Sequence, residues 1–142
     1  MQVVIAKPLQ QRIIQQMEQG YPNESGGFLL GTNSGEEIVV LDVIAITNVF
    51  AAEEQYHRYA MTPQDWMRLE DEADEKGLTL VGYYHSHPDS PAVPSIYDRD
   101  HALPNFTYII TAVMSGKAAE MRVWRLRGDR TQFDEHSLSV QD

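Results

Sequence analysis

The chain of 142 residues contains no cysteine. This absence excludes disulfide bonds, thiol catalysis and every zinc site built on thiolates, so a bound metal would need histidine and carboxylate ligands. The chain also has no apolar run long enough to cross a bilayer, and its start lacks the basic segment and sustained apolar stretch of a signal peptide. We therefore expect a cytoplasmic protein that does not associate with membranes.

Basic residues are scarce, with 11 Lys and Arg against 21 Asp and Glu, which gives a formal net charge of −10 and a pI of about 4.8. A net negative charge of this size repels phosphate backbones, so we expect no nucleic-acid partner. The acidity is expected to keep the protein in solution or to reflect a salty habitat. A surface evolved to meet a basic partner is the less favoured alternative, and the composition specifies no oligomeric state.

The composition, 42% hydrophobic and 23% charged, is that of a folded globular protein, and no repeat or linker interrupts it. We expect one domain over residues 1–142. The order of predicted elements is helix, strands, helix, strands, which indicates an α/β (α+β) domain with a mixed central sheet flanked by helices. The elements predicted are helices over 8–20 and 62–77 and strands over 38–46, 78–84, 106–114 and 121–126.

The first predicted helix begins near Pro8, which suits a first helical turn, and ends at Gly20. Its apolar residues recur every four positions and should form a buried stripe: Leu9, Ile13 and Met17. The strand over 38–46 is apolar at nearly every position, which predicts a strand covered on both faces.

The second predicted helix has helix-start chemistry around Thr62, with Pro63 in the first turn, and stops before Gly77. Trp66, Leu69 and Ala73 fall on one face of this helix and should be buried. The strand that follows runs directly into two histidines.

His85 and His87 lie two residues apart at the end of that strand, so both imidazoles should point to the same side of the sheet. Ser86 between them should face the other way as a packed small residue, and Pro88 should end the strand pairing. A histidine pair alone is weak evidence, because such pairs are often ordinary surface or core residues.

Asp98, after a loop with two prolines, can supply a third, anionic ligand. Two imidazoles and one carboxylate fill three positions of a tetrahedral zinc site and leave the fourth for water, which is typical of a catalytic rather than a structural site. Asp100 and His101 lie close by, and His101 would share a helical face with Asp98.

The wider pattern, His-x-His-Pro-x6-Ser-x2-Asp, occurs here as His85, His87, Pro88, Ser95 and Asp98. A chance match to such a pattern in one chain is on the order of one in ten thousand or rarer. The pattern resembles the signature of the JAMM, or MPN-plus, zinc metalloproteases. The resemblance, strongest to small stand-alone prokaryotic members, implies a single MPN-like domain with a layering like that of cytidine deaminases, and a zinc cofactor held by His85, His87 and Asp98.

The family pattern also includes a glutamate far upstream, and Glu24, in Tyr-Pro-Asn-Glu-Ser-Gly-Gly, fits that place. The small residues after Glu24 differ from the family's usual ones. The resemblance implies that Glu24 acts as general base and then general acid, and that Ser95 donates a hydrogen bond to the oxyanion. The alternatives are an exposed acid for Glu24 and a helix N-cap for Ser95, and the two roles of Ser95 are compatible.

By resemblance, the substrate is a peptide or isopeptide bond after the C-terminal Gly-Gly of a ubiquitin-like or sulfur-carrier protein. Its tail would lie extended against a sheet edge, and residues 49–60 are a candidate for one wall of that channel. Two alternatives stay open. One is a catalytically silent interaction scaffold of the same fold, and the other is a zinc hydrolase of a small amide substrate.

Overall fold

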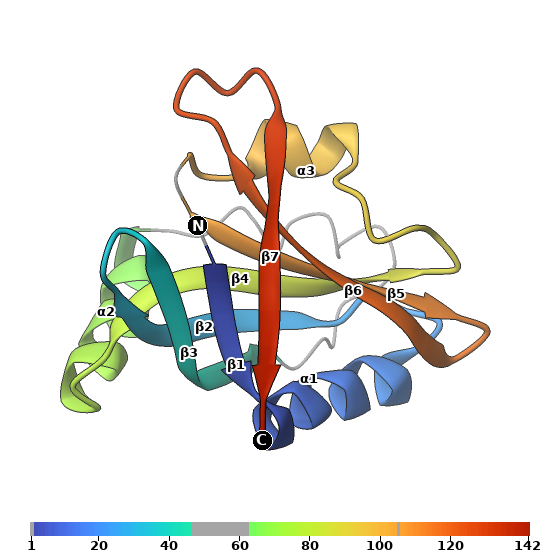
Figure 1. The fold of residues 1–142 in the computed structure, drawn as a ribbon, viewed down its shortest axis with the longest axis horizontal. Coiled ribbons are helices and arrows are strands. Elements are labelled where there is room, and N and C mark those ends of the chain that lie inside the picture. Colours follow the sequence, from blue (N-terminus) through green and yellow to red (C-terminus); the bar gives the residue numbers. More distant parts are fainter. Residues whose placement is uncertain (1, 47–62, 105) are drawn as a thin grey trace.

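The computed structural model describes residues 2–46, 63–104 and 106–142 of the chain, and for residues 46, 63–66, 97, 100 and 101 the backbone alone. These residues form seven strands and three helices (Figure 1). In chain order they are β1 (Gln2–Ala6), α1 (Lys7–Gly20), β2 (Gly26–Asn33), β3 (Glu37–Ile46), α2 (Pro63–Glu75), β4 (Thr79–Pro88), α3 (Ile96–His101), β5 (Thr107–Met114), β6 (Lys117–Leu126) and β7 (Phe133–Gln141).

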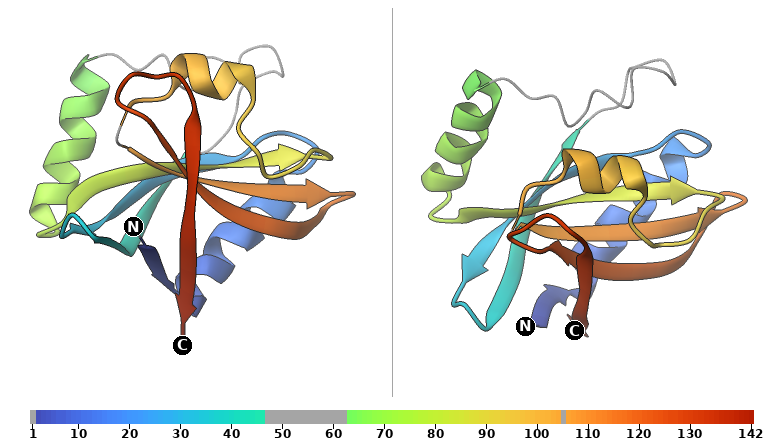
Figure 2. Two further views of the ribbon diagram at one scale, coloured as in Figure 1. Left: turned by 45° about the horizontal axis from the view of Figure 1, so that its top comes forward. Right: turned by 90° about the horizontal axis from the view of Figure 1, so that it is seen from above.

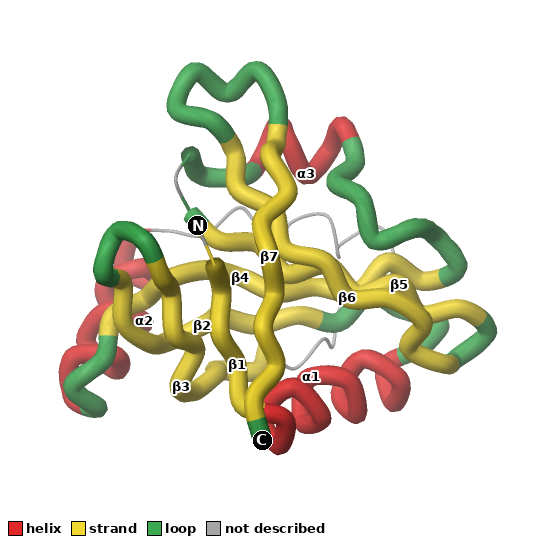
Figure 3. The backbone as a smooth tube through the Cα atoms, viewed as in Figure 1, coloured by secondary structure: helices red, strands yellow, loops and turns green. Residues whose placement is uncertain are grey.

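The strands form one mixed sheet that closes on itself in the order β1-β3-β2-β4-β5-β6-β7 (Figures 1 and 3). β1 closes the sheet, because it pairs in parallel with β3 on one side and with the C-terminal strand β7 on the other. The pair β4–β5 is parallel as well, and the remaining neighbours are antiparallel. The predicted mixed sheet with helices is therefore confirmed, whereas its closure and the strands β1, β2 and β7 were not among the predicted elements.

Helix α1 covers one core of the sheet. Leu9, Ile13 and Met17 are buried, and Pro8 stands in the first turn, as predicted. They pack with inward residues of β1, β2, β4 and β5 such as Leu29 and Ile109. Spacing of four residues keeps one side chain per turn on the same face, which is why a helix of this sequence docks here.

A second core lies on the opposite face of the same strands, beneath α2. Phe28 and Tyr108 belong to it, whereas their neighbours Leu29 and Ile109 belong to the first core, since successive strand residues point to opposite faces. Leu69 of α2 packs into this second core. The views in Figure 2 show the three helices at separate places around the sheet.

The prediction for α2 is confirmed in its extent and in the burial of Leu69 and Ala73. Thr62 and the side chain of Trp66 lie outside the described residues. No helix among the described residues is both long enough and apolar enough to cross a membrane.

The prediction that β3 is covered on both faces is confirmed only towards its end. Val43 packs into the first core, and its neighbour Ile44 packs against the second. Leu41 is 52% exposed, at the irregularity where the pairing with β2 passes from Val40 to Asp42. An apolar run alone therefore did not indicate burial on both faces along the whole strand.

Candidate metal centre

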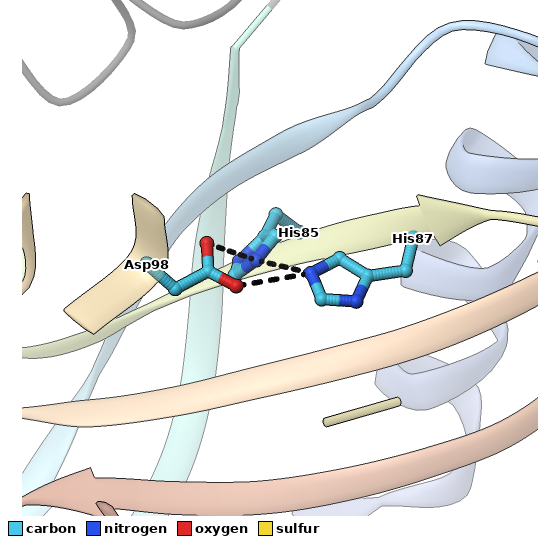
Figure 4. A group of neighbouring side chains, drawn as sticks. All are labelled: His85, His87 and Asp98. Carbon is cyan, nitrogen blue, oxygen red and sulfur yellow. Dashed lines mark hydrogen bonds and ion pairs between the residues drawn. The ribbon is translucent and has the colours of Figure 1, made fainter. Parts of the chain in front are cut away.

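Strand β4 carries both histidines in the middle of the sheet. It lies between β2 and β5, where Gly26 pairs with His85 and Ala112 pairs with His87. The strand continues through both histidines and ends at Pro88, as predicted. His85 is fully buried, and both imidazoles point to the same side of the strand (Figure 4).

Helix α3 brings Asp98 to the histidines. Ser95 is its N-cap: the Ser95 hydroxyl accepts a hydrogen bond from the Asp98 N–H at 3.0 Å, and Asp98 Oδ2 accepts one from the Ser95 N–H at 2.8 Å. This capping box fixes the direction in which the Asp98 carboxylate points. The predicted N-cap role of Ser95 is confirmed.

The loop between β4 and α3 is anchored at its centre. Trp124 Nε1 of β6 donates a hydrogen bond to Ala92 O at 2.9 Å, and Ala92 is buried against Ile110 and Ala112 of β5. A loop tied down in this way delivers Ser95 and Asp98 to a defined position. The sequence pattern gave the spacing of the loop but not this anchor.

Three metal-ligating side chains converge on one point (Figure 4). Asp98 Oδ1 lies 3.2 Å from His85 Nε2, Asp98 Oδ2 lies 3.1 Å from His87 Nε2, and the two Nε2 atoms are 3.2 Å apart. Two ligands bound tetrahedrally to zinc at about 2.0–2.1 Å lie about 3.3 Å from each other. The donor set and its spacing therefore fit a zinc ion, and these three side chains could hold one.

The ring orientation of His87 favours metal binding. His87 Nδ1 is 2.9 Å from Pro91 O, an acceptor, so the proton is assigned to Nδ1 and the lone pair of Nε2 faces Asp98 and His85. A histidine ligand is commonly held in this way by a carbonyl on its other nitrogen.

Electrostatic coupling among these groups is strong. Burial by itself would raise the pKa of Asp98, but the charge and hydrogen bond of His85, the hydrogen bond of His87 and the Ser95 N–H together hold that pKa far below its usual value. Burial would likewise lower the pKa of His87, but Asp98, Pro91 O and the charge of Glu24 raise it above the usual value. The neighbours of Asp98 and His87 thus favour the ionised form of each side chain.

Glu24 lies in the short loop between α1 and β2. Its Oε1 atom is buried, and its charge acts on His87, so the loop brings it to the edge of the donor cluster. It is therefore not the fully exposed acid of the alternative reading. Ser95 is exposed at the start of α3. The side chains of Asp100 and His101, and residues 49–60, lie outside the described part of the chain.

Ser86 was expected only as a packed small residue, and this prediction was incomplete. It is buried and faces away from the histidines, but its hydroxyl accepts a hydrogen bond from the Ser25 N–H at 2.9 Å. A second connection between β4 and β2 runs through α1, since the Gln16 side chain accepts from the Tyr84 hydroxyl and donates to Gly26 O. The bonds at Ser25 and at Gly26 involve main-chain atoms, and no pattern of residue types reveals such bonds.

The fold and this cluster define an α/β protein able to hold a divalent metal ion at the end of a central strand. Residues 6–127 match the family described as prokaryotic homologs of the JAB domain. The chain is 32% identical over 121 residues to the desampylase of Haloferax volcanii, an alignment that covers 84% of this chain and 80% of the relative.

Two solved structures have the same fold. A protein from Salinibacter ruber is 35% identical with a TM-score of 0.72, and the match covers 98% of this chain and 91% of the other. A protein from Desulfitobacterium hafniense is 24% identical with a TM-score of 0.80, covering 99% and 93%. The chain therefore belongs to the JAMM/MPN family, as one of its small prokaryotic members, and the predicted family is confirmed.

Proposed function

We propose that residues 1–142 act as a single zinc metallopeptidase domain that hydrolyses a peptide or isopeptide bond. The observation that carries this proposal is the convergence of three buried donors, His85, His87 and Asp98, with spacings that suit tetrahedral zinc. A zinc ion bound there supplies a Lewis acid, which polarises a scissile carbonyl and lowers the pKa of a water molecule. A catalytically silent scaffold would have no use for such a donor set.

Glu24 is the proposed general base. Its carboxylate accepts a proton from the attacking water and later delivers that proton to the nitrogen of the leaving amine, so the same group serves both steps. Its partial burial and the effect of its charge on the pKa of His87 support this role, because a base must be held near the reacting atoms.

Ser95 is the proposed donor to the oxyanion of the tetrahedral intermediate. In the capping box its oxygen acts as an acceptor, so the hydroxyl proton can be donated to substrate. One side chain can therefore cap α3 and stabilise the developing negative charge at the same time.

The proposed substrate is a conjugate of a ubiquitin-like or sulfur-carrier protein, cleaved after its C-terminal Gly-Gly. The family resemblance and the similarity to a protein named desampylase support this class. A cytoplasmic location stays a prediction.

Incubation with carriers that bear a C-terminal adduct, followed by intact-mass spectrometry, tests the proposal. Zinc-loaded protein should release the carrier ending in Gly-Gly together with a free amine. Cleavage of small amides without cleavage of any carrier would point to a small-molecule hydrolase, and no cleavage of either would point to the silent scaffold.

A further inference from the structure

Two contacts connect the loop that carries Glu24 to strand β4 and the residues that follow it. None of the residues in these contacts has a catalytic role in the proposed function. Glu24 belongs to neither α1 nor β2, and the ladder between β2 and β4 has its last registered pair at Gly26 and His85. Beyond this pair, Ser25 is hydrogen-bonded to Ser86, and Glu24 directly precedes Ser25. The contacts of the residues on either side of Glu24 therefore determine where its carboxylate lies.

Ser25 and Ser86 are joined by two hydrogen bonds. The Ser86 N–H donates to Ser25 O at 2.9 Å, and the Ser25 N–H donates to the Ser86 hydroxyl at 2.9 Å. In an ordinary antiparallel pair both acceptors are main-chain carbonyls. Here a side chain replaces one of them, so the second bond depends on the residue type at position 86. Both residues are buried, and water cannot readily replace a lost acceptor.

A second contact holds the other end of the loop. The Tyr21 hydroxyl donates to Asp89 Oδ2 at 2.6 Å. Asp89 is itself fixed, because its Oδ1 accepts from the Ser115 N–H at 2.8 Å and its own N–H donates to Val113 O at 2.8 Å. Tyr21 and Ser25 thus flank Glu24 in sequence.

The partners of these two residues, Ser86 and Asp89, flank His87 in the same way. The loop that carries the proposed base is therefore attached at both ends to the segment that carries a proposed metal ligand.

We propose that Ser86 is a positioning residue for Glu24, and that the Tyr21–Asp89 contact supports it at the far end of the loop. This inference rests on the proposed function, because it assigns Glu24 the role of base. Neither Ser86 nor Tyr21 is proposed to touch substrate. Their effect on hydrolysis passes through the placement of the Glu24 carboxylate, where a displacement of about 1 Å can cost on the order of a hundredfold in rate.

The decisive variant is Ser86→Ala, which removes the acceptor and little volume. We expect kcat to fall by about tenfold to a hundredfold, with KM and zinc per chain unchanged, since the histidine ligands stay on the opposite face of β4. Ser86→Thr, which keeps the hydroxyl, should recover most of the rate. Tyr21→Phe, at an exposed contact, should give a smaller loss of kcat of the same kind.

Thr111→Val is the matched control. Thr111 pairs with Ser86 in the parallel register of β4 and β5, and it is equally buried. Its hydroxyl has no hydrogen-bond partner among the described residues. Removal of that hydroxyl should leave kcat unchanged. A loss in Thr111→Val equal to that in Ser86→Ala would show that any change in this layer disturbs catalysis, and would overturn the proposal.

Amide hydrogen exchange of the metal-free protein provides a readout independent of activity. The Ser25 amide should be protected in the wild type and exchange rapidly in Ser86→Ala, while the amide of Leu29 in the middle of β2 keeps its protection. An unprotected Ser25 amide in the wild type, or an unchanged kcat in Ser86→Ala, would overturn the inference. Absence of hydrolysis in the wild type with a protected Ser25 amide would instead contradict the proposed function.

Discussion

The two sides of the candidate site are built in different ways. His85, His87 and Asp98 lie within fourteen residues of one another and are placed by one strand, one anchored loop and one capped helical turn. Glu24 comes from a loop whose contacts to that segment span more than sixty residues of sequence. The ligands thus come from one short segment with a tertiary anchor at Trp124, whereas the base is joined to that segment only through contacts distant in sequence. We expect damage to each side to have different consequences, in the order below.

Loss of a ligand should have the largest effect. Asp98→Ala removes the only carboxylate of the donor set and also one half of the capping box. We expect the variant to lose zinc and to lose hydrolysis by at least about a thousandfold, since a metal supplies several kcal/mol of transition-state stabilisation. Metal analysis and a progress curve measure both. Full zinc occupancy in Asp98→Ala would contradict the ligand assignment.

Loss of the base should abolish most hydrolysis without affecting zinc binding. Glu24→Gln keeps the shape of the side chain but cannot accept the proton, so we expect hydrolysis to fall by roughly a hundredfold to ten thousandfold. Zinc per chain should equal that of the wild type, because the ligands are held independently. If this variant hydrolyses the conjugate at the wild-type rate, another group is the base.

Ser95 joins structure and chemistry on the ligand side. Ser95→Ala should slow hydrolysis on the order of a hundredfold through loss of the oxyanion donor. It should also lower the free energy of unfolding by about 1 kcal/mol through loss of the cap. Ser95→Asp, which can cap but has no hydroxyl to donate, should recover the stability and not the rate. Recovery of the rate in Ser95→Asp would remove the catalytic role.

The smallest effect is expected for a long-range contact at the surface. Lys76 Nζ donates to Asp42 Oδ2 at 2.9 Å, across 34 residues of sequence, and chiefly this bond lowers the pKa of Asp42. A depressed carboxyl pKa stabilises the fold above the pKa of the unfolded state, about 3.9, and this gain is lost as pH falls through the folded-state value. Lys76→Ala should thus destabilise the protein slightly at pH 7 and not at low pH.

Urea unfolding at both pH values measures this difference. The expected effect is small because water screens an ion pair at the surface. The Ser25–Ser86 contact is buried, so its loss should have the larger effect. An equal effect of Lys76→Ala at both pH values would show that the side chain contributes through packing, not charge.

Local spacing explains what could be predicted from the sequence. The stripe of Leu9, Ile13 and Met17 predicted α1, and the motif spacing placed the two histidines beside Asp98. The closing strands were missed because β7 is largely polar, and its partner β1 lies at the other end of the chain. Ser86 was underestimated for a similar reason: its partner is a main-chain N–H, and such contacts leave no trace in residue types.

The zinc content of the wild-type protein, purified without added metal and then titrated with zinc, shows whether His85, His87 and Asp98 form a metal site. We expect one zinc per chain, held by these three residues and lost in the Asp98→Ala variant. A wild-type chain that contains no zinc and binds none on titration would contradict it.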